Sequence, residues 1–503
     1  MQPEFTFYWH DYETFGADPS WDRPAQFAGI RTDAALNEVD KPLVIYCKPP
    51  HDRLPQPEAC LLTGITPQIA EAEGVIEPQF IARIHEQLAQ PGTCALGYNT
   101  LRFDDEVTRY ALYRNFYDPY AREWQHGNSR WDLIDLVRMA YALRPDGINW
   151  PCHESGKPSF RLEDLARANG LLHESAHDAL SDVRATIALA KLIKARQPRL
   201  YEWLFRLRDK REAARLIDMA AHTPLVHTSR MYPAETGCTT LVMPMLAETA
   251  NVNSILVYDL RHDPSEFLAM DTATLAERLF TPGADLPPEA TRLPVKAIKL
   301  NKCPALAPRK ILDKSTASRI KLDIDQCLQH AQLLSGQQDF MQRILHAYTS
   351  RSFNCARDAE RALYDGFISN ADRALLPGVR LAPPEKMADY ANRFQDKRYS
   401  VLLFRYRARF WPQTLSDEEK LRWQIFCQRQ LIEKETDDSH TLSSYQVQLD
   451  WLRNELSQNP SSSEKTLDDL EVWGATLARA CKLDREPDIR LLENSDRSED
   501  EAG

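Results

Sequence analysis

The hydrophobic pattern changes twice along the 503 residues, and this change is the strongest constraint on the fold. Residues 1–200 alternate strand-like and helix-like segments, such as the strand pattern KPLVIYCKP and the helical pattern DDEVTRYALYRNF. Strands that alternate with helices pack as a layered α/β domain with a mixed sheet. We therefore expect a first α/β domain over residues 1–200.

Short strands and then helices follow this domain. Strand-like segments between residues 222 and 305, among them TTLVMPM and SILVYDL, predict a small β-rich domain, which we place at 201–350. Helical periodicity returns from about residue 325, and we expect a helical domain over 351–483. The last 20 residues hold eight acids and three bases, which predicts an acidic, disordered tail over 484–503.

The first strand pattern, EFTFYWHDYETFG, ends at two acids. Asp11 and Glu13 are two residues apart, so in a strand they point to the same side, where their charges repel. A hard cation such as Mg²⁺ would explain the pair, but it needs further oxygen ligands. Two segments supply candidates: GYNTLRFDDE, with Asp104 and Asp105, and HESAHDALSD, with His177, Asp178 and Asp182.

Spacing alone leaves both choices of acid open. Asp104 and Asp105 are neighbours at a helix start, where either could simply cap the helix. Asp178 and Asp182 are four residues apart, which places them on one helix face. His177 lies five residues before Asp182, a separation that does not stack two side chains on a regular helix. We therefore expect His177 in the preceding loop.

The set Asp11-x-Glu13, Asp104 and His177-x4-Asp182 resembles the three motifs of the DEDD exonuclease superfamily, in its histidine subclass. Longer segments resemble bacterial exonuclease I, among them DRPAQFAGIRTD, LLTGITPQ, YALRPDGINWP and HDALSDVRATIALAKLIKARQPRL. The likeness is strong over residues 5–201 and weaker in later segments such as LYDGFISNADR. This family pattern favours Asp104 over Asp105 and Asp182 over Asp178.

The resemblance implies an RNase H-like mixed-sheet exonuclease domain, an SH3-like β-rich domain and an α-helical C-terminal domain. It also implies processive 3′→5′ digestion of single-stranded DNA to 5′-mononucleotides, in DNA repair and recombination. Two Mg²⁺ ions, with Mn²⁺ as a substitute, are then held by Asp11, Glu13, Asp104 and Asp182, with Asp11 bridging both. His177 matches the general base, because an imidazole titrates near pH 6.5.

Single strands are bound by aromatic stacking and by basic side chains along the phosphates. Thr63, Gly64 and Ile65 match the family segment that meets the terminal nucleotide. Phe15 and Phe103 flank the acidic motifs and are candidates for stacking, although core packing is the alternative for each. Further candidate phosphate or sugar contacts are Asn99, Arg102 and Arg130. The segment RYRARFWP would place three arginines on one face if it were extended, and packing at a domain interface is the alternative.

The net charge of −11 hides two basic segments. Residues 191–215 hold nine bases and three acids, and residues 291–321 hold nine bases and one acid. Such segregation allows an acidic protein to bind single-stranded DNA. The resemblance also implies binding of the acidic, Phe-ending tail of single-stranded DNA-binding protein, for which Arg144 is a candidate, and a monomer is expected.

The sequence predicts a location in the bacterial cytoplasm. It has no run of 18 apolar residues and no secretory signal, and its ten cysteines are scattered without a C-x-x-C pair. Two other functions stay open: an RNase or proofreading exonuclease of the superfamily, and a non-catalytic single-stranded DNA-binding protein. About 300 residues beyond a minimal nuclease argue against the first, and the intact set of acids argues against the second.

Overall fold

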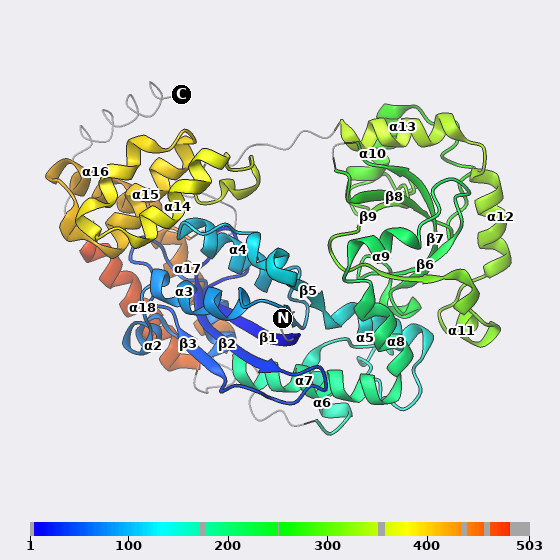
Figure 1. Cartoon of the computed structure of the whole chain (residues 1–503), viewed down its shortest axis with the longest axis horizontal. Coiled ribbons are helices and arrows are strands. Elements are labelled where there is room, and N and C mark those ends of the chain that lie inside the picture. The colour runs from blue at the N-terminus through cyan, green and yellow to red at the C-terminus, as the bar shows by residue number, and fades with distance from the viewer. Residues whose placement is uncertain are drawn as a thin grey trace.

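The computed structural model describes residues 5–171, 178–249, 251–350, 358–433, 440–456 and 463–482. Figure 1 shows the β-rich middle part of the chain, in green, standing apart from the helices of the C-terminal part, in yellow to red, with the first domain joining them. The tail predicted over 484–503 lies outside the described residues.

The first domain contains the predicted mixed sheet. Its strands, in spatial order, are β3 (Leu43–Tyr46), β2 (Pro24–Thr32), β1 (Thr6–Thr14), β4 (Thr93–Gly97) and β5 (Ser129–Asp132). β1 runs antiparallel to β2 and parallel to β4, and β4 runs parallel to β5. The helices of this domain are α1 (Pro57–Thr63), α2 (Pro67–Glu73), α3 (Glu77–Leu88), α4 (Asp104–Arg114), α5 (Leu133–Leu143), α6 (Leu162–Ala168), α7 (Ala179–Arg196), α8 (Pro198–Arg206) and α9 (Lys210–Arg215).

Alternation along β1 decides what its end can carry. Tyr8 and Tyr12 belong to the core beneath α3 and α4, whereas Phe7 and Trp9 belong to the core shared with α5 and α7. Odd-numbered side chains of β1 therefore face α7. Asp11 and Glu13 continue this row, so the strand delivers both acids to the side from which α7 approaches.

The second domain is a five-stranded sheet whose neighbouring strands are all antiparallel. In spatial order these are β10 (Ala305–Pro308), β6 (Leu225–Thr228), β7 (Thr239–Ala247), β8 (Ser254–Asp259) and β9 (Val295–Lys299). Its helices are α10 (Thr272–Phe280), α11 (Lys314–Arg319), α12 (Ile324–Leu334) and α13 (Gln338–Thr349). One continuous hydrophobic core joins this sheet to α5, α7 and α8 of the first domain.

The C-terminal domain is helical, as predicted: α14 (Asn370–Leu381), α15 (Lys397–Phe410), α16 (Asp417–Ile432), α17 (Leu442–Leu456) and α18 (Ser463–Ala480). The extended reading of RYRARFWP is wrong, because α15 runs through Phe410. Arg405, Arg407 and Arg409 pair with Asp358, Glu419 and Asp52 at 2.6, 2.6 and 2.8 Å. In the described part of the chain, no helix is long and apolar enough to cross a membrane.

Candidate active site and nucleic-acid groove

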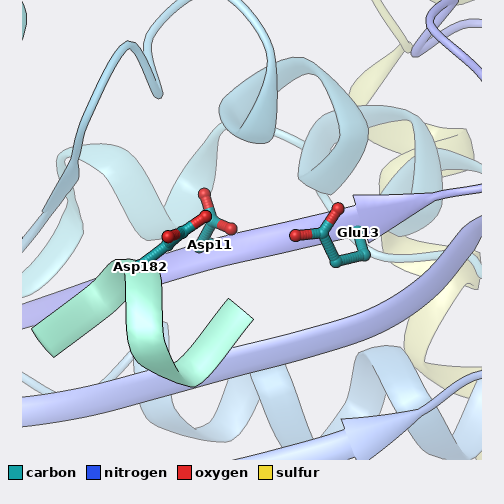
Figure 2. Close-up of side chains that lie close together, drawn as sticks. All are labelled: Asp11, Glu13 and Asp182. Atoms are coloured by element: carbon teal, nitrogen blue, oxygen red, sulfur yellow. The ribbon is translucent and has the colours of Figure 1, made fainter. Parts of the chain in front are cut away.

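Three acids from two elements meet at the end of β1. Asp11 and Glu13 lie on β1 and Asp182 in the first turns of α7, and each offers a carboxylate oxygen within 4.8 Å of the others. Figure 2 shows the carboxylates of Asp182 and Asp11 adjacent, with Glu13 farther along the same side of the strand. Asp178 is the N-cap of α7 and accepts a hydrogen bond from the Ser181 amide at 3.1 Å. Among the described residues, the cluster therefore contains Asp182 and not Asp178.

Repulsion and burial raise the proton affinity of these acids. Burial, together with the charges of Asp104 and Asp182, raises the pKa of Asp11 well above its usual value. Burial and the charges of Asp11 and Asp182 raise the pKa of Glu13 to about 9. A divalent cation between the carboxylates would reverse this effect, since it stabilises the ionised form. The all-oxygen donor set fits Mg²⁺ or Mn²⁺.

Asp104 and Asp105 are neighbours in the chain but have different surroundings. The Tyr12 amide of β1 donates to Asp104 Oδ1 at 2.9 Å, which holds this buried carboxylate beside the strand. Asp105 instead pairs with Arg122 at 2.6 Å and Arg130 at 2.7 Å. Burial alone would raise the pKa of Asp105, but these guanidinium groups lower it below its usual value. Asp105 is thus engaged in a buried ion pair.

The general base of the prediction, His177, lies in residues 172–177, outside the described part of the chain. Its role stays a prediction. The described chain resumes at Asp178, which caps α7, so the segment carrying His177 leads directly to the helix that bears Asp182.

A cavity of about 520 Å³ lies next to Glu13 and is lined in part by Thr63 and Phe103. Thr63 Oγ1 accepts a hydrogen bond from the Ile65 amide at 3.1 Å, which shapes the link between α1 and α2. Gly64 is exposed and has φ of 70°, a left-handed conformation that favours glycine. The cavity thus has a wall formed by part of the predicted terminal-nucleotide segment.

Other predicted DNA contacts are turned elsewhere. The side chains of Phe15 and Ile65 are buried in a hydrophobic cluster shared with the C-terminal helices, so core packing is what the structure gives for both. Arg130 is 8% exposed and pairs with Asp105 and Glu123, the latter at 3.0 Å. These placements do not favour direct contact of the three side chains with DNA.

A groove of about 1170 Å³ runs between the three domains. Asn99 and Arg102 line it from the first domain, as the prediction requires of DNA contacts. Seven bases and four acids line it in total, a net charge of +3; the bases are Arg102, Arg109, Arg138, Arg230, Lys296, Lys299 and Lys302. Arg102 lines the groove and the next residue, Phe103, lines the cavity, so neighbouring residues of the chain border the two hollows.

The groove also exposes large apolar side chains, which sequence reasoning missed. They are Trp124 (65% exposed), Met231 (59%), Val252 (82%), Tyr364 (53%) and Phe367 (90%). Exposed rings interleaved with cations are typical of surfaces that bind single strands. The three domains each contribute to this set, so no local pattern could have assembled it.

Comparison with known proteins agrees with this architecture. A family model described as Exonuclease matches residues 8–190. A model of the exonuclease I SH3-like domain matches residues 208–350, and a model of the exonuclease I C-terminal domain matches residues 357–477. The Escherichia coli K12 protein named Exodeoxyribonuclease I is 49% identical over 419 residues, covering 83% of this chain and 88% of that protein. The chain belongs to the exonuclease I family.

Other members of the exonuclease I family give the same picture. The Haemophilus influenzae protein of the same name is 44% identical over 462 residues, covering 89% of this chain and 98% of its own. The crystal structure of E. coli exonuclease I in complex with a dA16 oligonucleotide matches with a TM-score of 0.90 and 45% identity, over 94% of this chain and 100% of that one. A structure of SSB/exonuclease I in complex with the inhibitor CFAM matches with a TM-score of 0.87 and 44% identity, with the same coverage.

Membership in the exonuclease I family confirms three predictions made from sequence. The fold is a mixed α/β exonuclease domain followed by an SH3-like domain and a helical C-terminal domain. The chain is an exodeoxyribonuclease. The resemblance to exonuclease I is the third, since the family models match residues 8–190, 208–350 and 357–477.

Proposed function

We propose that this chain is a processive 3′→5′ exonuclease that degrades single-stranded DNA to 5′-mononucleotides with two Mg²⁺ ions. The convergence of Asp11, Glu13 and Asp182 within 4.8 Å carries the proposal. When bound, two divalent ions neutralise the phosphodiester, activate water and stabilise the departing 3′ oxygen. Asp11 would contribute to holding both ions, Glu13 and Asp182 would help to hold one of them, and Asp104 would support the other.

The protein's own groups hold this arrangement in place. The Tyr12 amide fixes the carboxylate of Asp104, and the β1 pairing with β2 fixes the spacing of Asp11 and Glu13. His177 receives the proton of the attacking water, since a neutral imidazole accepts a proton near neutral pH. In the metal-free cluster the pKa of Glu13 is raised to about 9, so its ionised form is disfavoured there. Bound cations would stabilise the ionised carboxylates.

The substrate occupies both the cavity and the groove. The 3′-terminal nucleotide occupies the cavity beside Glu13, with Thr63 and Phe103 against it. The upstream strand runs along the groove, where exposed rings such as Phe367 stack on bases and Lys296, Lys299 and Lys302 contact phosphates. Contacts far from the cut reduce dissociation between cuts, which supports processivity, and counterion release makes that grip salt-dependent.

A separate pocket fits the tail of single-stranded DNA-binding protein. It measures about 560 Å³ and combines the cations Arg144 and Arg199 with the apolar side chains Leu200, Trp203 and Ile311. An acidic peptide ending in Phe offers carboxylates for the first set and a ring for the second. Replacing Arg144 by Ala should weaken binding of such a peptide, measured by fluorescence anisotropy, and leave digestion of naked DNA unchanged.

Digestion of labelled single strands tests the proposed activity. With Mg²⁺, a 3′-labelled strand should release its label in the first products, while a 5′-labelled strand shortens progressively; with EDTA both should stay intact. An excess of unlabelled competitor DNA tests processivity, because a processive enzyme continues on the strand it holds. Matched RNA strands separate a deoxyribonuclease from a superfamily RNase. We place the enzyme, as a monomer, in DNA repair in the bacterial cytoplasm.

Asp11→Ala tests the catalytic reading. This variant should lose cleavage and keep DNA binding in EDTA, because the groove and cavity are unchanged. Full retained activity would remove Asp11 from the mechanism.

A further inference from the structure

The cavity beside Glu13 has walls whose outer sides are covered by the C-terminal domain. Two segments of the first domain form these walls: residues 16–22, in the turn from β1 to β2, and residues 56–63, which include α1. Neither segment belongs to the sheet interior. Each is held from behind by contacts with residues more than 300 positions later in the chain.

Helix α18 packs behind the second wall. Its side chains Leu470, Trp473 and Leu477 are buried in one cluster with Cys60 of α1 and Ile65 of the α1–α2 link. Figure 1 shows α18, in red, beside α2. Polar contacts add to this packing. Gln68 of α2, just beyond the wall, donates to the Asp469 carbonyl of α18. Within the wall, Glu58 accepts from Gln448 of α17, and His440 Nε2 contacts Gln56 Oε1 at 2.8 Å.

Charged groups of the C-terminal domain hold the first wall. Glu360 accepts hydrogen bonds from Arg23 and Arg53, both at 2.8 Å, and all three side chains are buried. Arg361 pairs with Asp18 at 2.9 Å, and Asp18 lines the cavity. A buried charge that loses its partner costs several kcal/mol, so the Glu360 cluster fixes the turn firmly.

We propose that the C-terminal domain is a positioning element for the 3′-terminal nucleotide. Its docking sets the shape of both cavity walls and thereby the fit of the last nucleotide beside Glu13. This inference rests on the proposed function, which places that nucleotide in the cavity. It assigns the C-terminal domain a role that is separate from lining the groove, because α18 and Arg361 do not line the groove.

The role predicts a specific kinetic pattern for two mild variants of the full chain. Gln68→Ala removes the hydrogen bond to α18, and Arg361→Gln removes the ion pair to the cavity wall. For a trinucleotide, which is too short to fill the groove, each variant should raise KM about three- to ten-fold, the effect of one lost polar contact. The kcat should stay within about two-fold, and binding of a 40-nucleotide strand in EDTA should be unchanged, because the metal ligands and the groove are untouched.

A double-mutant cycle between Asp18→Asn and Arg361→Gln isolates the ion pair at the first wall. If the pair acts as one unit, the double variant should raise KM no more than the single variants do. For the Gln68 contact, Val472→Ala is the matched control, because Val472 lies on α18 but is 58% exposed. Arg361→Lys should restore much of the KM, since it keeps a cation opposite Asp18. Thermal denaturation of each variant confirms that it is folded at the assay temperature.

Two results would overturn the inference. The first is that folded Gln68→Ala and Arg361→Gln leave the KM for the trinucleotide unchanged. The second is that they weaken binding of the 40-nucleotide strand by the same factor by which they raise KM. Thr63→Ala and Phe103→Ala, which alter the cavity lining itself, test the underlying function separately. If these two leave KM unchanged, the terminal nucleotide does not occupy the cavity, and that part of the proposed function fails together with this inference. If they raise KM while Gln68→Ala and Arg361→Gln do not, only the positioning role fails.

Discussion

Replacing Asp11 by Asn should stabilise the metal-free protein and abolish its response to metal. Asp11 lies within 4.8 Å of ligand oxygens on Glu13 and Asp182, with Asp104 also raising its pKa. Asn keeps the shape of the side chain and removes its charge. The repulsion within the cluster therefore falls, whereas the ligand that bridges the proposed metal positions is lost.

The size of the effect follows from the geometry. Two unit charges 4.8 Å apart repel by about 3 kcal/mol at an effective dielectric constant of about 20. Much of this is already relieved at pH 7, since a Glu13 whose pKa is about 9 carries a proton there in the metal-free state. We therefore expect a gain in unfolding free energy of about 1–3 kcal/mol at pH 7 in EDTA, with a larger gain near pH 9.

Thermal denaturation of the wild type and Asp11→Asn, in EDTA and with Mn²⁺, measures this. A gain of 1 kcal/mol shifts the Tm by about 2–4 °C for a domain of about 200 residues. The variant should melt above the wild type in EDTA, and Mn²⁺ should raise the Tm of the wild type alone. Glu73→Gln, at an exposed acid of α2, controls for the loss of one negative charge. The reasoning would be refuted if Asp11→Asn melted below the wild type in EDTA, or if Mn²⁺ raised the Tm of Asp11→Asn as much as that of the wild type.

Three further predictions concern the same site and the groove. The folded metal-free protein keeps a proton on Glu13 up to about pH 9, whereas the unfolded chain loses that proton near pH 4.5. The stability of the metal-free protein should therefore fall as pH rises between these two values, and its affinity for Mn²⁺ should rise over the same range. A flat affinity from pH 6 to 9 in Mn²⁺ titrations would contradict this. Asp105→Asn should lower the unfolding free energy by about 3–5 kcal/mol in urea, because it removes the buried carboxylate that Arg122 and Arg130 share and leaves both near Glu123 alone, while Mn²⁺ still binds the three-acid cluster; unchanged stability would show that the pair is dispensable. Phe367→Ala should weaken binding of a 40-nucleotide strand in EDTA by about 1–3 kcal/mol and leave digestion of a trinucleotide unchanged, whereas equal losses on both substrates would place Phe367 outside the groove path.

Sequence periodicity predicted the elements well where one face is buried. The alternation of Phe7 and Trp9 with Tyr8 identified β1, and the same alternation placed Asp11 and Glu13 on one side. The prediction of an extended segment at RYRARFWP is wrong because arginines two residues apart fit one face of a strand but occur here in a helix. The buried residues of α15 include Tyr399, Leu402, Leu403 and Tyr406, which follow the helical spacing of three and four that begins before this segment. The residues before RYRARFWP therefore indicate the helix that continues through it.

Within the candidate site, the residues themselves predicted the acids, whereas Thr63, Phe103, Asn99 and Arg102 depended on the family resemblance or on their place beside the acids. A metal cluster needs specific residue types at spacings set by a strand and a helix start, and these leave a local trace in the sequence. Whether Ile65 and Phe15 face the DNA or the core depends on α16–α18, which lie more than 350 residues away in the chain. The exposed apolar side chains of Trp124, Met231 and Phe367 have the same limitation, because their groove exists only when three domains are assembled.

Asp104 and Asp105 show how the fold holds acids together without ions. Consecutive residues at a helix start point about 100° apart, so one carboxylate can face β1 while the other faces β5. Asp105 is anchored to Arg122 and to Arg130 of β5, and this anchor fixes the first turn of α4. Asp104 is thereby held against the Tyr12 amide although its own pKa is raised well above the usual value by burial. The ion pairs of Asp105 stabilise the start of α4, and this stabilisation offsets the cost of holding Asp104 in a buried position next to it. Any effect of Asp105→Asn on kcat should therefore act through the position of Asp104, and adding Asp105→Asn to Asp104→Asn should lower kcat no further than Asp104→Asn alone.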